Sequence, residues 1–204
     1  ILFGGLAVVG TECGIGIDGA VINARDASPV CAGLLFGAPA GIIAGVIGGA
    51  ERWFAVFWGA GAYTRLACSI STVLAGIFAA VLRRYMFDNK KPKWYYCLAT
   101  AVITEVIHML MIFLTNMTDA RTAFSFVRAC ALPMIAVNGL AVMLAGALLS
   151  VLSGREKKGA RHDLKNISQS FQRWLLLCVT AGFLMTTVFT WALQTELAEN
   201  ETHD

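Results

Sequence analysis

The chain has 204 residues, of which 57% are hydrophobic and only 14% are charged, and its formal net charge is +3. A soluble domain has about a quarter of its residues charged, and the interior of a domain of this size is too small for such an apolar excess. The composition therefore excludes an ordinary soluble domain. Together with a mean hydropathy of +0.68, it predicts an all-α fold, a polytopic transmembrane bundle of about six helices, multi-pass in the inner (plasma) membrane of a cell.

The first ten residues, ILFGGLAVVG, are already apolar and contain no Met, no basic segment and no cleavage site. They are therefore not a signal peptide, and we interpret them as the end of a membrane helix. The C-terminal residues LQTELAENETHD are polar. Both ends predict that the chain is a fragment of a longer protein.

Five later stretches approach or reach the roughly 20 apolar residues that a spanning helix needs. They are residues 29–50, 64–82, 95–114, 127–152 and 174–193. Most of the Lys and Arg residues lie in two of the connections, 83–93 and 154–173. Because basic loops face the cytoplasm, both connections are predicted to be cytoplasmic, with the loop 115–121 and the C-terminal tail outside. This topology explains the positive charge, so nucleic-acid binding is not expected.

The glycine-rich stretch 29–50 allows two conformations. As one helix rising 1.5 Å per residue, it would place Arg25 and Arg52 about 40 Å apart, on opposite sides of the membrane. A break within FGAPAG (36–41) would instead place both arginines on the same side, facing one cavity. Pro39 and its glycine neighbours favour a bend, whereas the length of the stretch favours a kinked crossing. The sequence leaves both conformations open.

Every fourth residue from Gly33 to Gly49 is glycine. Small residues at this spacing let helix backbones approach closely. The stripe predicts tight packing of one helix face, either within one protomer or between the two copies of a homodimer.

The six cysteines show no Cys-x-x-Cys motif and no Cys/His cluster at zinc spacing. They are Cys13, Cys31, Cys68, Cys97, Cys130 and Cys178. Because cysteine in apolar stretches is usually a small buried residue, neither a disulfide framework nor a structural metal is predicted. Glu105 and His108 form a single Glu-x-x-His motif, and a di-iron site needs two such motifs and further carboxylates. No metal and no cofactor are therefore expected.

Polar and charged residues inside a membrane are costly, which makes them candidate functional residues. Glu105 and His108 share one face of the helix predicted over 95–114, and Thr104 and Asn138 could join them. Two alternatives remain open for the pair. Glu105 and His108 either neutralise each other by a hydrogen bond within the helix or bind a ligand.

Arg25 and Arg52 each have an acidic neighbour, Asp26 and Glu51. Taken alone, such pairs are typical of helix ends at the membrane surface. Cys68 and Ser71 share a face of the next predicted helix, where a hydroxyl usually bonds back to the preceding turn.

The order of these motifs resembles the LytS-type five-transmembrane receptor domain over about residues 1–152. The matching positions are Asn23, Arg25, Asp26, Gly33 to Gly41 around Pro39, Arg52, Cys68, Ser71, Thr72, Ala75 and Gly76, with GTECGI (10–15) and EVIHM (105–109). The chain departs from the family pattern at three places. Glu51 stands where members usually carry His, the loop between Arg52 and Cys68 is longer, and the span 174–193 is additional.

The resemblance implies a sensory module. Members of the family precede histidine kinases, diguanylate cyclases or related effector domains, and their fold is broadly similar to the substrate-binding subunits of vitamin transporters. The implied organisation is a sensor domain at 1–152, a cytoplasmic basic connection at 153–172, an additional transmembrane helix at 173–194 and an extracytoplasmic segment at 195–204.

Some members of the family are receptors for small carboxylates such as pyruvate, so the resemblance implies an intramembrane pocket for a small anionic ligand. Two guanidinium groups suit a carboxylate because they bind it through charge-assisted, often bidentate hydrogen bonds. The expected ligand-binding residues are Asn23, Arg25, Asp26, Arg52, Cys68, Ser71, Glu105 and His108. We expect Arg25→Ala or Arg52→Ala to abolish binding of the anion.

Two other function classes compete with the receptor. A substrate-binding membrane subunit of a small-molecule transporter is the alternative, and it predicts a chain that ends after about six spans and pairs with an ATPase complex. An integral-membrane enzyme lacks support, because no nucleophile–base set, metal triad or phosphate loop is recognised in the sequence. No catalytic residue is predicted. The expected partners are the anionic ligand, membrane lipid and a second copy of the chain.

Overall fold

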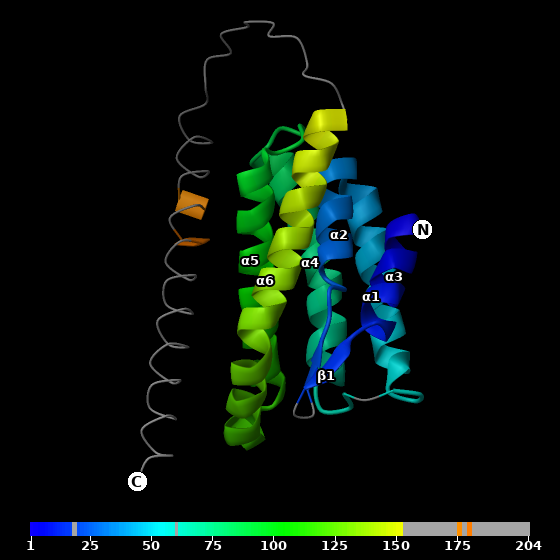
Figure 1. The fold of residues 1–204 in the computed structure, drawn as a ribbon, viewed down its shortest axis with the longest axis vertical. Coiled ribbons are helices and arrows are strands. Elements are labelled where there is room, and N and C mark those ends of the chain that lie inside the picture. Colours follow the sequence, from blue (N-terminus) through cyan, green and yellow to red (C-terminus); the bar gives the residue numbers. More distant parts are fainter. Residues whose placement is uncertain (18–19, 60, 153–174, 177–178, 181–204) are drawn as a thin grey trace, which may run out of the picture.

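The computed structural model describes residues 1–17, 20–59, 61–152, 175–176 and 179–180. The larger elements in this part form an upright bundle of α-helices (Figure 1), namely α1 Leu2–Glu12, α2 Ala27–Cys31, α3 Ala38–Ala55, α4 Arg65–Tyr85, α5 Trp94–Thr115 and α6 Ala120–Leu152. The smaller elements are the strands β1 Ile15–Ile17 and β2 Ala20–Ile22, the π-helical turn η1 Ala32–Phe36 and the 3₁₀ turn η2 Met117–Asp119. The predicted all-α membrane bundle is confirmed.

Within the described residues, three helical segments are long and apolar enough to cross a membrane, Arg65–Tyr85, Trp94–Thr115 and Met117–Leu152. They correspond to the predicted spans 64–82, 95–114 and 127–152. Two further apolar helices are shorter, Leu2–Glu12 and Ala27–Phe36. The predicted connection 153–172, the segment 195–204 and most of the predicted helix 173–194 lie outside the described residues.

The glycine-rich stretch does not form one straight helix. The helical segment Ala27–Phe36 ends at Gly37, whose φ of +119° and ψ of 173° belong to a conformation that side chains disfavour. The amide N–H of Gly37 donates a 3.0 Å hydrogen bond to the Ala32 carbonyl, and α3 then begins at Ala38 with Pro39 in its first turn. The chain reverses here, so the broken conformation is the correct one of the two left open by the sequence.

We expect Gly37→Ala to lower stability by about 1–3 kcal/mol, because a non-glycine residue is strained in this backbone conformation. The added methyl group would meet nothing within 4 Å, so the cost comes from the backbone alone. Gly5→Ala in α1 is the matched control, because that position is equally open and has no positive φ. The thermal midpoints of the two purified variants in detergent provide the measurement. Equal thermal midpoints for Gly37→Ala and Gly5→Ala would contradict the expected backbone strain at Gly37.

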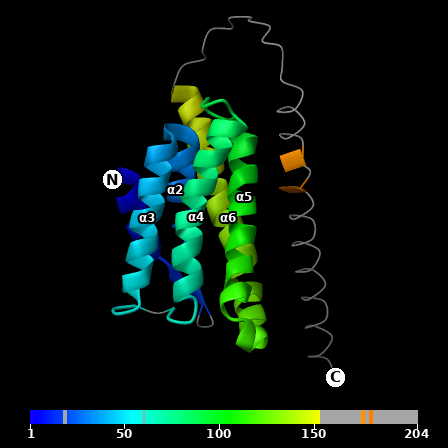
Figure 2. The ribbon, with the colours of Figure 1, turned by 180° about the vertical axis from the view of Figure 1, so that it is seen from behind.

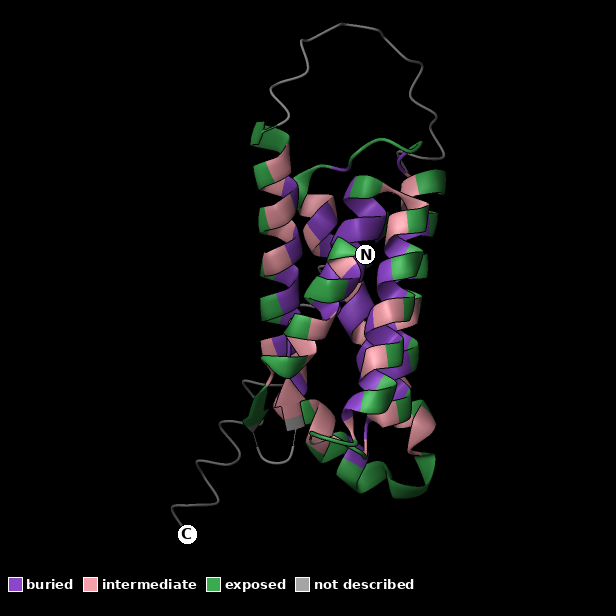
Figure 3. Ribbon diagram, turned by 90° about the vertical axis from the view of Figure 1, so that its right-hand side faces the viewer, coloured by how far each residue is buried: buried purple, intermediate pink, exposed green. Residues whose placement is uncertain are grey.

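Helix α2 lies at the centre of the bundle. It contacts α1, α3, α4, α5 and α6, and all five of its residues are buried. Figure 2 shows the bundle from behind, with α2 between its neighbours. Figure 3 shows that buried residues face inward on the long helices and that exposed residues face outward. The segment that leads into this short helix, residues 20–26, is extended at β2 and turns into α2 at Arg25 and Asp26.

The glycine stripe packs α3 against α4 within one protomer. A methyl group added at Gly45 would lie 2.9 Å from the Thr72 carbonyl oxygen, and one added at Gly49 would lie 2.7 Å from that of Ser69. These distances leave no space for a side chain, so the two backbones are in direct contact. The homodimer alternative for this stripe is therefore not needed, although dimer formation itself stays a prediction.

The connection between α4 and α5 lies at the same end of the bundle as the C-terminal end of α6 (Figure 1). This connection contains the basic residues of 83–93, and residue 152 leads into the second basic stretch. The arrangement agrees with the predicted alternating topology, in which both basic connections face the same side of the membrane.

Candidate functional site

A cluster of buried polar residues lies where the extended segment meets α2, α4 and α5. Arg25 and Asp26 directly precede α2, and they face Thr72 of α4 and His108 of α5. All four are almost completely buried. Because polar groups buried in a membrane bundle need partners, the contacts of this cluster decide what it can bind.

Asp26 is the central residue of the cluster. Its Oδ1 atom lies 3.2 Å from Arg25 Nε and accepts a 2.6 Å hydrogen bond from the Thr72 hydroxyl. Its Oδ2 atom lies 2.7 Å from His108 Nδ1. Arg25 Nε also donates to the Thr72 oxygen at 2.7 Å. One carboxylate therefore joins side chains from the extended segment, α4 and α5.

Two residues of the cluster keep polar atoms without a partner. Arg25 is 0% exposed, and among the described residues neither of its terminal guanidinium nitrogens has a hydrogen-bond partner. Both carboxylate oxygens of Glu105, which is 1% exposed, are likewise without one in the described part of the chain. Glu105 lies 3.8 Å from His108 Nδ1, which belongs to the hydrogen bond with Asp26. Glu105 and His108 are thus brought together as a pair, but the contact leaves the Glu105 carboxylate without a hydrogen bond in the described part of the chain.

Cys68 completes a chain of contacts through the imidazole ring. Its Sγ atom lies 3.3 Å from His108 Nε2, while the Nδ1 atom of the same ring faces Asp26. Cys68, His108 and Asp26 are separated by 40 positions or more along the chain, so their spacing predicts no nucleophile–base set. The structure places them in contact.

Asn138 of α6 connects the extended segment to the bundle. Its Oδ1 atom accepts a 2.9 Å hydrogen bond from the amide N–H of Ala27, and its Nδ2 atom donates to the Asn23 carbonyl at 3.0 Å. The Oδ1 atom of Asn23 in turn accepts a 3.3 Å hydrogen bond from the amide N–H of Arg25. Asn23 and Asn138 therefore shape the backbone around Arg25, since these hydrogen bonds are with main-chain groups.

The two arginines lie along one face of α3. A methyl group added at Gly48 would lie 3.9 Å from Arg25 Cγ, and Arg52 follows Gly48 by one helical turn. Arg52 is buried, and its Nη2 atom donates a 2.7 Å hydrogen bond to the Gly61 carbonyl in the loop after α3. The arginines are therefore not on opposite sides of the membrane. A terminal nitrogen of Arg52 has a protein partner, whereas those of Arg25 have none in the described residues.

Ser71 does not point into the cluster in the predicted way. Its hydroxyl donates back to the carbonyl oxygens of Ala67 and Cys68, at 2.8 and 3.2 Å. The neighbouring Thr72 makes the side-chain contacts instead. Thr72 follows Cys68 by four residues, which places both on one helix face, and this spacing is the signal that could have identified it. Thr104 is also turned back to its own helix, at Thr100.

Asp26, Glu105 and His108 bring one oxygen or nitrogen atom each within 4.8 Å of one another, a spacing that a metal ion could bridge. The single Glu-x-x-His motif thus acquires a third donor from another segment. However, His108 Nδ1 is engaged by Asp26, and the Arg25 guanidinium beside that carboxylate would repel a cation.

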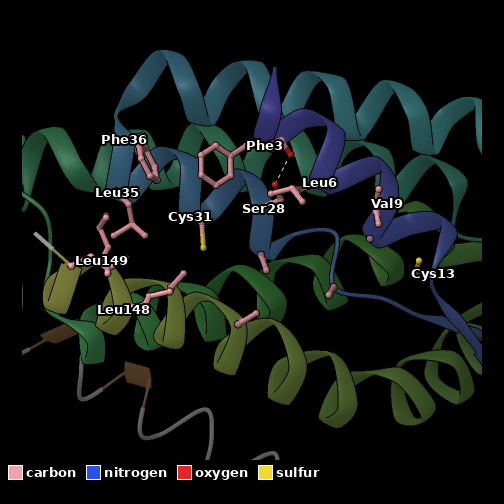
Figure 4. A pocket seen from close by; sticks show the side chains of 16 residues that line it. Phe3, Leu6, Val9, Cys13, Ser28, Cys31, Leu35, Phe36, Leu148 and Leu149 are labelled. Carbon is pink, nitrogen blue, oxygen red and sulfur yellow. Dashed lines mark hydrogen bonds between the residues drawn. The ribbon is translucent and has the colours of Figure 1, made fainter.

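A separate groove of about 490 Å³ lies on the outside of this region, between α1, α2 and α6 (Figure 4). Phe3, Phe36, Leu35 and Leu149 point into it. Its lining is almost entirely apolar, and the Ser28 hydroxyl there donates to the Phe3 carbonyl. The groove therefore has no group that would hold an anion, and it is distinct from the cluster around Asp26.

The described residues form a helical membrane bundle with a buried charged cluster, which defines the class of polytopic membrane domains. The family model described as the 5TMR of 5TMR-LYT matches residues 1–151, and the chain belongs to this family. The resemblance stated from the motifs is thereby confirmed, as is the membrane location.

Three relatives are sensor proteins. The chain is 26% identical over 164 residues to the sensor histidine kinase YpdA of Escherichia coli, covering 80% of this chain and 28% of that protein. It is 28% identical over 148 residues to the sensor histidine kinase BtsS of the same species, covering 71% and 25%. It is 32% identical over 157 residues to the sensor protein LytS of Staphylococcus haemolyticus, covering 74% and 26%. The chain thus spans about a quarter of the length of these relatives, and no solved structure matches it.

Proposed function

We propose that this chain is a transmembrane receptor domain that binds a small carboxylate anion inside the helix bundle and relays binding to an effector domain. The single observation that carries the proposal is Arg25, which is fully buried with two terminal nitrogens that have no partner in the described residues. A buried guanidinium with unused donors is costly unless a ligand supplies acceptors.

A carboxylate matches these donors in charge and in shape. The guanidinium is planar and presents parallel N–H groups, so it binds the two oxygens of a carboxylate at once. Arg25 is also held in place from the other edge, because its Nε atom is engaged by Asp26 and Thr72. The free edge is thus preorganised for a small anion, which lowers the entropy cost of binding.

The position of the cluster supports a role in signalling. Asp26 joins the extended segment to α4 and α5, and the adjoining helix α2 contacts the five other helices. A ligand that binds one packing of these helices more tightly than another shifts the population between them. Because YpdA and BtsS are sensor histidine kinases, the effector we propose is a kinase domain of this kind in a longer protein.

Arg25→Gln tests the proposal. We expect it to weaken binding of short carboxylates such as acetate, lactate and pyruvate by at least about tenfold, because a hydrogen bond to a charged group contributes roughly 1.5–3 kcal/mol and 1.4 kcal/mol corresponds to tenfold. Isothermal titration calorimetry of the purified chain in lipid nanodiscs measures the affinity. Arg84→Gln removes the same charge at an exposed position at the far end of α4 and is the matched control.

Neutral amides of the same acids should not bind to the unaltered chain. Arg25→Lys, which keeps the charge but loses the planar fork, should recover only part of the affinity. The proposal fails if Arg25→Gln, shown to be folded by its circular dichroism, binds the acids as tightly as the unaltered chain.

A further inference from the structure

We propose that Cys68 is an activated nucleophile that forms a reversible covalent bond to the ligand. The ligand must therefore have an electrophilic carbonyl carbon beside its carboxylate group. The inference rests on the proposed function, because it requires the carboxylate to bind at Arg25. It adds a chemical step, which noncovalent binding of an anion does not include.

The first observation is the arrangement of thiol, imidazole and carboxylate. Cys68 Sγ lies 3.3 Å from His108 Nε2, and Asp26 Oδ2 lies 2.7 Å from Nδ1 of the same ring. A nucleophile within reach of a base that is oriented by a third group is the arrangement found in enzymes that use an activated cysteine. Asp26 is the positioning residue here, because it holds the ring so that Nε2 faces the sulfur.

The positioning residue is itself firmly held. Asp26 Oδ1 accepts a 2.6 Å hydrogen bond from the Thr72 hydroxyl and lies 3.2 Å from Arg25 Nε. Thr72 and Cys68 come from consecutive turns of α4, so one helix supplies both the sulfur and the group that fixes Asp26. The triad is thus connected at each of its members, which indicates a preorganised site rather than a chance contact.

The second observation is what lies beside the sulfur. Arg25 Nε donates to Thr72 Oγ1 at 2.7 Å, and the same Thr72 oxygen lies 2.9 Å from the Cys68 carbonyl oxygen. The terminal nitrogens of Arg25 have no partner in the described residues. A carboxylate bound at those nitrogens brings the carbon next to it close to Sγ. If this carbon is a carbonyl carbon, the nucleophile and the electrophile are placed together, so the ligand class is a small 2-oxo carboxylate.

The environment of Cys68 differs from that of the other buried cysteines. Cys31 and Cys97 lie in one apolar cluster of the core, and Cys130 lies in a second. Apolar surroundings keep a thiol inert. Cys68 instead has a polar neighbour, because its sulfur faces the His108 ring.

The bond-forming step is balanced without a further reactant. The Cys68 thiol transfers its proton to His108 Nε2, and the sulfur attacks the carbonyl carbon. A carbon–sulfur bond forms, the π bond of the carbonyl group breaks, and the resulting alkoxide takes the proton back from Nε2. The product is a hemithioketal. Reversal of the same steps releases the ligand unchanged, as a receptor requires.

The experiment compares a 2-oxo acid with the 2-hydroxy acid of the same chain length, pyruvate with lactate, on the full chain in nanodiscs. The two have the same charge and similar size, but only pyruvate has an electrophilic carbon. We expect the unaltered chain to bind pyruvate at least tenfold more tightly than lactate. In Cys68→Ser this preference should disappear, whereas Cys97→Ser, the control at a buried cysteine of the first apolar cluster, should retain it.

Carbon-13 NMR of pyruvate labelled at its carbonyl carbon reports the bond directly. With the unaltered chain, the bound signal should move from the carbonyl region to that of a tetrahedral carbon bonded to sulfur and oxygen, and Cys68→Ser should abolish this signal. The spectrum of the unaltered chain tests for the carbon–sulfur bond even if a variant does not fold. A bound pyruvate that keeps its carbonyl signal overturns the covalent bond and leaves the anion receptor standing. If neither acid binds, the proposed function itself is overturned.

Discussion

Replacing Asp26 with leucine is expected to destabilise the folded chain by about 3–5 kcal/mol, because removal of one partner leaves a buried charge uncompensated. Asp26 forms an ion pair with Arg25, which is fully buried, and it also engages Thr72 and His108. The variant should therefore show a much lower thermal midpoint in detergent, or accumulate poorly in the membrane. Thermal unfolding monitored by size-exclusion chromatography provides the measurement.

The double variant Arg25→Met with Asp26→Leu separates two causes of the lost stability. One is the uncompensated charge of Arg25, and the other is a general loss of packing. Because a buried ion pair can be replaced by apolar residues at little cost to stability, the double variant should recover most of the lost stability. It should nevertheless bind no carboxylate, since the guanidinium is absent. A double variant that is less stable than Asp26→Leu alone would contradict this explanation.

The second large effect is expected at Gly76, where α4 meets α3. A methyl group added there would collide with the backbone of Gly41, lying 2.9 Å from its carbonyl carbon, and would lie 3.4 Å from Gly45 Cα. Overpacking of this kind typically costs about 1–3 kcal/mol, and more where rigid backbone cannot yield. We therefore expect Gly76→Ala to destabilise the chain by about 3 kcal/mol.

Gly139→Ala is the matched control for this substitution. Gly139 also lies within a long helix, but its added methyl group would meet the flexible side chain of Leu98 at 3.1 Å and that of Val102 at 3.9 Å. Since alanine favours a helix over glycine by about 1 kcal/mol, this variant should be close to neutral. The thermal midpoints of the two variants, measured side by side, check the expectation. Similar losses would mean that the α3–α4 contact tolerates a side chain.

Much of the fold follows from local properties of the sequence. Long apolar stretches form helices in a membrane because each backbone group must find its partner within the segment, and three predicted spans agree with α4, α5 and α6. The family was also recognisable, because the residues around Arg25 and those following Arg65 occur in a specific order. These features depend on residue type and spacing along one segment.

The break at Gly37 could not be decided in this way. Glycine and proline permit both a kinked crossing and a reversal, and only the packing of α3 against α4 selects the second. The contacts at Gly45 and Gly49 with the backbone of α4 show how close that packing is. The reversal at Gly37 is thus selected by the contact between α3 and α4 that it makes possible.

The sequence by itself determined which residues are costly inside a membrane, and it included Arg25, Asp26, Glu105 and His108 among them. Only the tertiary structure decided their partners. Ser71 turned back to its own helix, while Thr72 reached Asp26. The physical reason is that hydrogen bonds and ion pairs act over about 3 Å, whereas these partners are separated by 46 to 82 positions along the chain. Spacing along one helix predicts a face, but the reversal at Gly37 and the extended segment before α2 determine what that face meets.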